Sequence, residues 1–313
     1  RIIGERLLRE QKQWYDIPDA DVPAICRQAT DELAPQVQHD ILMSNAYFAQ
    51  IKERLIQTLT RTVRRLSAFS AVSDFHMEGL EKSFGRPGSP WEALRFTLKN
   101  GLQVVVTGQI DRIDTLRQGD HKYVVIIDYK SGRKQLDISQ IFTGLELQLL
   151  TYMFVALLNI GGDAIPAAVL YCYVRNDKVS LEYRVSEEDK KKLYDAKGKL
   201  TGFYLDDGQV MQQLDTSMQG FSDFLNLRLK KDGTLSDSSH TLYNEAGWSH
   251  LLDWAARQIR DIAGHIGDGD ISIHPILMGQ QAPCSYCPYR PVCRFDVAVA
   301  GNTYDAAGRE DTD

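Results

Sequence analysis

"VVIIDYKSG", residues 124–132, begins with four apolar residues and ends with an acid, a tyrosine, a base and a Ser-Gly turn. Side chains two apart on a β-strand point to the same face, so Asp128 and Lys130 share one face while Tyr129 points to the other. The apolar run before them is hydrophobic on both faces, which is typical of a central strand that is covered on both sides. We therefore predict a buried strand that presents Asp128 and Lys130 together where it ends.

The strand expected before it, residues 102–120, also carries acidic residues. Asp111 and Asp114 lie three positions apart in "GQIDRID", so on an extended strand they face opposite sides and only one can join Asp128. We choose Asp111, because it follows the apolar run and Gly108, and a glycine in a strand often lets another group approach closely. If the two strands are neighbours, two carboxylates and one ammonium meet at one place.

Two carboxylates at contact range repel each other unless another charge compensates. A divalent cation does so, and hard oxygen ligands with several retained waters suit Mg²⁺. In this interpretation Asp111, Asp128 and the backbone carbonyl of Tyr129 bind the ion, and Lys130 is the catalytic cation that acts on the attacking water or on the phosphate charge. The alternative is an ordinary Asp128–Lys130 ion pair at a strand end, worth about 0–1 kcal/mol.

One apolar helix is predicted after this strand, over residues 138–162, closed by two glycines. Gln148 and Tyr152 are four apart on it and share one face. Both are polar on a helix otherwise rich in Leu, Met and Phe. They are either the polar edge of the helix or a pair that reaches a phosphate or the metal site.

The order of elements predicts an α/β fold with a mixed sheet flanked by helices. Helical spacing dominates the first part of the chain, strand candidates with glycine-rich turns follow, and Asn100–Gly101 is a strong hairpin signature. Beyond the helix at 138–162 we expect paired strands in 166–185, charged helices at 186–232 and a helix at 247–269. The expected units are a helical segment (1–72), a core (73–275) with a helical insertion near 186–240, a Cys-rich segment (276–298) and a loose tail (299–313).

The composition is that of a globular protein, because 43% of the 313 residues are hydrophobic and 25% are charged. The formal net charge is −6, so a nucleic-acid partner would be held by local patches, by metal ions or by another subunit. No apolar run reaches the length of a membrane span, and the start at Arg1 suggests a piece of a longer chain. One predicted helix has a basic face that reads as solvated, with contact to phosphates as the alternative. Its residues are Arg54, Arg61, Arg64 and Arg65.

Three of the five cysteines, Cys284, Cys287 and Cys293, lie within ten residues of one another. This C-x2-C-x5-C spacing favours a metal site over a disulfide framework. A tetrahedral zinc site or a [4Fe–4S] cluster needs a fourth ligand. Cys26 and Cys172 are favoured as buried structural residues. His274 is a possible fourth ligand of zinc.

Taken together, "GQIDRID", "IIDYKSG" and "LQLLTY" resemble the motifs of RecB-like nucleases in the PD-(D/E)XK superfamily. By position, Asp111 corresponds to motif II, Asp128 and Lys130 to motif III, and Gln148 and Tyr152 to the Q-x-x-x-Y motif. The resemblance implies a restriction-endonuclease-like fold and a Mg²⁺-dependent nuclease.

The cysteines after these motifs resemble the nuclease domain of AddB-type subunits, which pair with AddA in a bacterial helicase–nuclease. That resemblance implies a [4Fe–4S] cluster, single-stranded DNA as substrate in double-strand-break repair, an AddA partner, no membrane, and a bacterial cytoplasmic location. It also implies that the fourth cysteine and the motif I residue lie upstream of residue 1. Glu78 or Glu81 is a possible substitute ligand, although a structural role is favoured for each. The alternatives are a non-catalytic DNA-binding scaffold that keeps the fold and a zinc-stapled structural protein.

Overall fold

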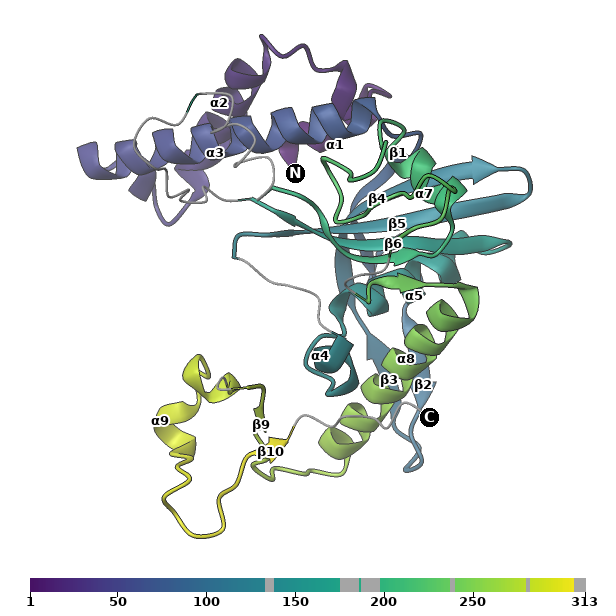
Figure 1. Ribbon diagram of the computed structural model, residues 1–313. Coiled ribbons are helices and arrows are strands. Elements are labelled where there is room, and N and C mark those ends of the chain that lie inside the picture. The colour runs from purple at the N-terminus through teal and green to yellow at the C-terminus, as the bar shows by residue number, and fades with distance from the viewer. Residues whose placement is uncertain (133–137, 175–185, 187–197, 237–239, 280–281, 307–313) are drawn as a thin grey trace.

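The structure is a computed structural model that describes residues 1–132, 138–174, 186, 198–236, 240–279 and 282–306 (Figure 1). Its centre is a six-stranded sheet with the order β1-β4-β5-β6-β7-β8. Because β5 runs antiparallel to β4 and parallel to β6, the predicted mixed α/β sheet is confirmed. The strands are β1 (His76–Phe84), β4 (Gly108–Gln118), β5 (His121–Lys130), β6 (Ala164–Tyr173), β7 (Thr201–Leu205) and β8 (Leu242–Tyr243).

The apolar run before Asp128 lies in the middle of this sheet. Residues 124–127 are fully buried, because β4 and β6 flank β5 and helices cover both faces of the sheet (Figure 1). Burying each of these side chains stabilises the fold by about 1.5–3 kcal/mol. The strand end that carries Asp128 and Lys130 is therefore held on a rigid scaffold.

Helices cover the two faces of the sheet in separate groups (Figure 1). α1 (Ile2–Arg9), α2 (Val22–Leu33) and α3 (Ala46–Ala71) lie on one side, joined by short 3₁₀ turns. α5 (Gln148–Ile160) and α8 (Glu245–Gly267) lie on the other. The 3₁₀ turns are η1 (Trp14–Asp16), η2 (Ala34–Gln36) and η3 (Ile41–Met43).

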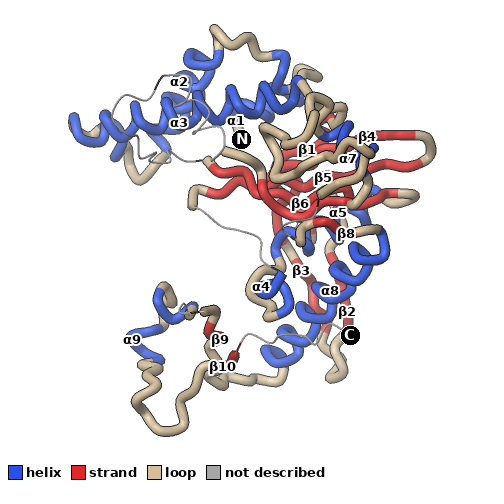
Figure 2. The backbone as a smooth tube through the Cα atoms, viewed as in Figure 1, coloured by secondary structure: helices blue, strands red, loops and turns tan. Residues whose placement is uncertain are grey.

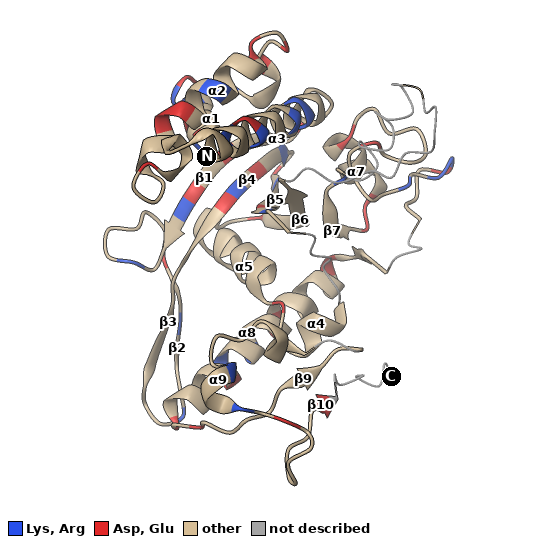
Figure 3. Ribbon diagram, turned by 90° about the vertical axis from the view of Figure 1, so that its left-hand side faces the viewer, with Lys and Arg blue, Asp and Glu red and all other residues tan. Residues whose placement is uncertain are grey.

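The predicted hairpin at Asn100–Gly101 is present as a separate two-stranded sheet of β2 (Leu94–Thr97) and β3 (Gln103–Val106). It extends along α8, where Arg260 lies over the Phe96 ring (Figure 3). The single strand expected over residues 102–120 was wrong. β3 pairs with β2 whereas β4 pairs with β1 and β5, so the chain changes sheets between them.

The single helix predicted over residues 138–162 was also wrong. It consists of α4 (Ile138–Phe142) and α5, which begins at Gln148. Gly144 between them has a φ of 74°, a left-handed conformation that ends a helix and that glycine adopts without strain. Gln148 therefore stands in the first turn of a helix rather than in its middle.

Residues 186–232 were predicted to be helical, but the described part of this range, from residue 198, contains β7 and only one short helix, α7 (Gly208–Leu214). β7 pairs with β6 at very close range, since a Cβ on Gly202 would lie 1.8 Å from the Val169 carbonyl oxygen. Charge composition does not reveal such a long-range pairing. The second strand expected in 166–185 and the residues 187–197 lie outside the described ranges.

The C-terminal segment leaves the sheet after α8 (Figure 2). It contains β9 (Ile276–Leu277), which pairs in parallel with β10 (Asp305–Ala306), and between them η4 (Pro283–Ser285) and α9 (Arg290–Cys293). No described helix combines the length and hydropathy that crossing a bilayer requires.

Candidate active site

Asp111 and Asp128 face each other across β4 and β5. The antiparallel ladder ends with Arg112 opposite Ile127, so the next pair outward is Asp111 and Asp128. Residues directly opposite in such a ladder share a face, with Cβ atoms about 4.5–5.5 Å apart. Asp111 Oδ2 also accepts a hydrogen bond of 2.9 Å from the backbone N–H of Tyr129. The structure thus brings the two carboxylates together at the strand ends.

Lys130 and Gln148 complete a hydrogen-bonded network around Asp128. Lys130 Nζ lies 2.7 Å from Asp128 Oδ2 and donates to Gln148 Oε1 at 2.9 Å. Gln148 Nε2 donates to Asp128 Oδ1 at 3.0 Å and to the Tyr152 hydroxyl at 2.9 Å. The Asp128 side chain is only 2% exposed and that of Lys130 is 23% exposed, so the ammonium compensates a buried carboxylate and still reaches the surface.

Tyr152 is held as a hydrogen-bond donor at the edge of this network. Burial raises the pKa of Tyr152, the hydrogen bond from Gln148 lowers it, and the charges of Asp128 and Asp111 raise it again, so the net shift is upward. The phenol is therefore neutral at physiological pH. Since its oxygen accepts from Gln148, its own proton can be donated to a bound oxyanion.

Packing against Phe84 fixes the position of the Tyr152 ring. The two rings meet edge to face with centroids 6.0 Å apart. Phe84 is fully buried and lies over Gly108, where an added Cβ would be 2.6 Å from the ring. The absence of a side chain at Gly108 gives Phe84 its place, and Phe84 in turn supports Tyr152.

Gly108→Ala is expected to lower the free energy of unfolding by about 1–3 kcal/mol, because overpacking forces buried groups apart. Urea denaturation with an unchanged m-value would measure the loss. Gly264→Ala on α8 is the matched control, since its new methyl group would meet no atom within 4 Å. Equal stability of the two variants would show that Phe84 is not held tightly over Gly108.

A third acidic residue, Glu81 on β1, lies next to Asp111. The β1–β4 ladder pairs Lys82 with Ile110 and Leu80 with Arg112, which sets Glu81 opposite Asp111. Burial raises the pKa of Glu81, and the charge of Asp111 raises it further. Its backbone is left-handed, with a φ of 48°.

The other acidic residue on β1, Glu78, faces a different environment. It pairs with Lys122 and accepts from Thr115, at the opposite end of β5 from Lys130. Of the two possible substitute ligands, only Glu81 therefore adjoins Asp111.

The side chains at this site suit a hard cation with few protein ligands. Among the described residues, no three His, Cys, Asp or Glu side chains gather closely enough to hold a metal ion by themselves. Mg²⁺ is commonly bound by one or two carboxylates, with waters and substrate phosphates completing its shell. The carboxylates of Asp111 and Asp128, beside the backbone of Tyr129, fit that pattern.

A buried ion pair lies on the opposite face of the sheet, directly behind the carboxylates. Arg112 Nε and Nη2 each lie 2.7 Å from an oxygen of Asp114, and both side chains are 2% exposed. The guanidinium also sits 5.8 Å from the Trp14 ring centroid, which joins β4 to the helical segment. Asp114 therefore belongs to the core rather than to the site.

The three clustered cysteines lie on the C-terminal segment, away from this site. Cys284 and Cys287 are half-buried and Cys293 is exposed. His274, the possible zinc ligand, lies 3.6 Å from Asp305. Within the described residues these thiols do not form a metal-holding group of three or more ligands.

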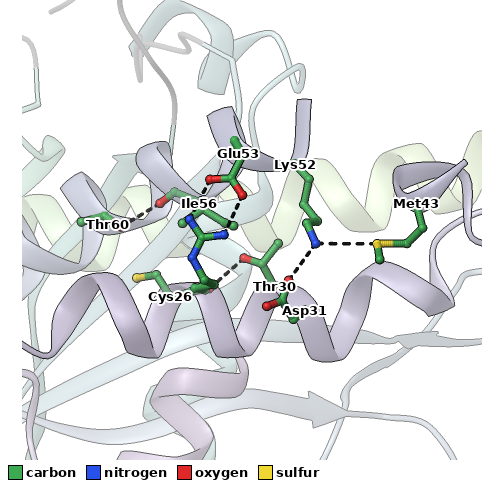
Figure 4. Close-up of polar contacts among 9 residues, drawn as sticks. Cys26, Thr30, Asp31, Met43, Lys52, Glu53, Ile56 and Thr60 are labelled. Atoms are coloured by element: carbon green, nitrogen blue, oxygen red, sulfur yellow. Dashed lines mark hydrogen bonds and ion pairs between the residues drawn. The ribbon is translucent and has the colours of Figure 1, made fainter. Parts of the chain in front are cut away.

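The other two cysteines are buried elsewhere in the fold. Cys26 lies between α2 and α3, where Thr30 donates to its carbonyl at 2.8 Å (Figure 4). Burial raises the pKa of Cys26, and it raises the pKa of Cys172 in β6 to about 11. Both thiols are therefore protonated core groups.

Two arginines of the basic face on α3 are used inside the protein. Arg64 pairs with Asp19 at 2.8 Å. Arg65 donates to the carbonyls of Gly198 and Asp223 at 2.7 Å each. The described contacts give these two side chains structural partners and leave less of the face for a phosphate backbone.

Comparison with known proteins agrees with this geometry. A sequence profile of the PD-(D/E)XK nuclease superfamily matches residues 6–294. Three relatives, each named as the B-type subunit of an ATP-dependent helicase/deoxyribonuclease, come from Moorella thermoacetica (35% identical over 98% of this chain), Bacillus licheniformis (33% over 97%) and Bacillus subtilis (33% over 97%). The match covers 26–27% of each relative, so the chain spans about a quarter of their length. The chain belongs to the PD-(D/E)XK nuclease superfamily.

Proposed function

We propose that this chain is the Mg²⁺-dependent nuclease domain of an AddB-type subunit and hydrolyses phosphodiester bonds of single-stranded DNA during double-strand-break repair. The observation that carries the proposal is the connected arrangement of two carboxylates, an ammonium, an amide and a phenol at the ends of β4 and β5 and the start of α5. By analogy with the relatives' name, the partner is a second helicase–nuclease subunit of the AddA type. With a net charge of −6, DNA must be held by local groups rather than by bulk charge.

Asp111, Asp128 and the Tyr129 carbonyl would hold the ion. When bound, Mg²⁺ supplies Lewis-acid polarisation of the phosphate and lowers the pKa of a coordinated water. Glu81 adjoins Asp111 and adds negative charge to the same row of strand ends.

The chain's own residues orient and stabilise the reacting phosphate. Lys130, fixed by Asp128 and Gln148, places a positive charge where negative charge develops on the phosphate oxygens. Tyr152 donates its hydroxyl proton to a non-bridging oxygen or to the DNA backbone. Gln148 bonds to all three of these side chains and keeps their geometry before substrate arrives.

Cleavage of end-labelled single-stranded DNA is expected with Mg²⁺, to disappear with EDTA, and to return when excess Mg²⁺ is added. Asp111→Asn is expected to weaken Mg²⁺ binding measured by calorimetry, because it removes one of two carboxylate ligands. Asp120→Asn, in the exposed β4–β5 turn, is the matched control. Cleavage that persists in EDTA would contradict the metal, and DNA binding without cleavage would favour the scaffold alternative.

We also propose that Cys284, Cys287 and Cys293 supply three thiolates to a [4Fe–4S] cluster, with a fourth from outside the described residues. Protein purified without oxygen is expected to contain iron and sulfide and to absorb visible light. Cys287→Ser is expected to lower the iron content, whereas Cys26→Ser, at a buried site between α2 and α3, is expected to leave it unchanged. Zinc in place of iron would favour the zinc-stapled alternative.

A further inference from the structure

A buried pair of side chains lies beneath Lys130 and has no place in the mechanism above. The Tyr171 hydroxyl donates a 2.5 Å hydrogen bond to Glu146 Oε1. Tyr171 is fully buried on β6, and Glu146 is 2% exposed in the turn between α4 and α5. A buried carboxylate so close to a nuclease site is costly unless it is held for a purpose.

Both members of the pair adjoin residues of the proposed site. The parallel β5–β6 ladder sets Tyr171 beside Asp128, and Lys130 Nζ lies 5.4 Å from the centroid of the Tyr171 ring. Glu146 stands two positions before Gln148, the first residue of α5. One hydrogen bond therefore fixes both the ring under the ammonium and the turn that delivers the amide.

We propose that Glu146 and Tyr171 form a positioning pair that holds Lys130 and Gln148 in their working geometry. This inference rests on the proposed nuclease function and adds two residues that the motif spacing does not include. The ring face attracts the ammonium electrostatically, and the carboxylate stops the ring from moving. Burial and the hydrogen bond to Glu146 raise the pKa of Tyr171, so the hydroxyl keeps its proton and remains the donor.

The test compares variants made in the 313-residue chain, with cleavage of labelled single-stranded DNA in Mg²⁺ as the assay. Tyr171→Phe keeps the ring and loses the hydrogen bond, and kcat is expected to fall about tenfold with KM changed less than about twofold. Tyr171→Leu also loses the ring, and kcat is expected to fall about 100-fold. Glu146→Gln keeps an acceptor oxygen and is expected to retain most activity, whereas Glu146→Leu is expected to behave like Tyr171→Phe.

Tyr204→Phe is the matched control. Tyr204 is another fully buried tyrosine, on β7, and its hydroxyl donates to the Leu200 carbonyl at 3.0 Å. It should cost similar stability but leave kcat unchanged. The double variant Tyr171→Phe/Glu146→Leu should be no slower than Glu146→Leu alone, because both changes remove the same bond. Full kcat in Tyr171→Phe, or an equal loss in Tyr204→Phe, would overturn the proposal.

A second measurement does not depend on cleavage. Acetylation of Lys130 by an amine-reactive reagent, followed by mass spectrometry, is expected to become several-fold faster in Tyr171→Leu and Glu146→Leu than in wild type or Tyr204→Phe. An unchanged rate would overturn the positioning pair even if the wild type cuts DNA. Failure of the wild type to cut would instead refute the nuclease proposal, and the acetylation rates would still decide on the pair.

Discussion

Lys130→Ala is expected to lower the rate of DNA cleavage by about 10³-fold while the protein still folds and binds DNA. Loss of one preorganised charge at a reacting group typically costs about 10²–10³-fold in rate. Here the loss is expected at the upper end, because the ammonium also compensates the Asp128 carboxylate at 2.7 Å. Lys130→Arg is not expected to restore activity, since a planar guanidinium cannot take the place of a compact ammonium between Asp128 and Gln148.

Lys122→Ala is the matched control for this prediction, because Lys122 lies on the same strand, β5, and forms an ion pair with Glu78 at the strand's other end. Single-turnover cleavage with excess protein, together with DNA binding by fluorescence anisotropy, separates chemistry from affinity. The expected result is normal cleavage in Lys122→Ala and a loss confined to chemistry in Lys130→Ala. Wild-type cleavage by Lys130→Ala would mean that the observed nuclease acts at another site.

The parts of the fold that sequence predicts well are those set by burial on both sides of a strand. The run at residues 124–127 reads as a central strand because nothing in it can face water, and the structure places it there. Prediction fails where distant contacts decide. Gly144 divides the helix at 138–162 because the chain turns there, and β7 replaces a predicted helix because Gly202 lets it approach β6.

The site shows the same division between local and distant information. Alternation along a strand and spacing along a helix set Asp128 with Lys130 and Gln148 with Tyr152, and these are local rules. The supports around them are distant in sequence: Phe84 reaches Tyr152 from β1, and Tyr171 reaches Lys130 from β6. Their importance depends on strand order and register, which motif spacing does not specify.

The ion pair behind the carboxylates carries the largest expected effect on stability. Asp114→Ala is expected to lower the free energy of unfolding by about 3–5 kcal/mol, because it leaves the Arg112 guanidinium buried without its carboxylate. Burial lowers the pKa of Arg112, but Asp114 and Tyr129 outweigh it and raise the pKa, so the side chain stays charged. Denaturant unfolding measures the loss, and Glu53→Ala, which breaks an exposed pair with Arg27, should change little.

Replacing both members distinguishes a lost interaction from a stranded charge. Arg112→Met/Asp114→Leu is expected to be more stable than Asp114→Ala, because apolar groups of similar volume carry no desolvation penalty. Since Arg112 follows Asp111 on β4, the double variant also tests whether a well-packed back face is sufficient to hold the site. Recovered stability with normal Mg²⁺ binding would show that packing alone orders Asp111, whereas recovered stability with weak binding would show that the ion pair fixes the register of β4. A double variant as unstable as Asp114→Ala would contradict the stranded-charge explanation.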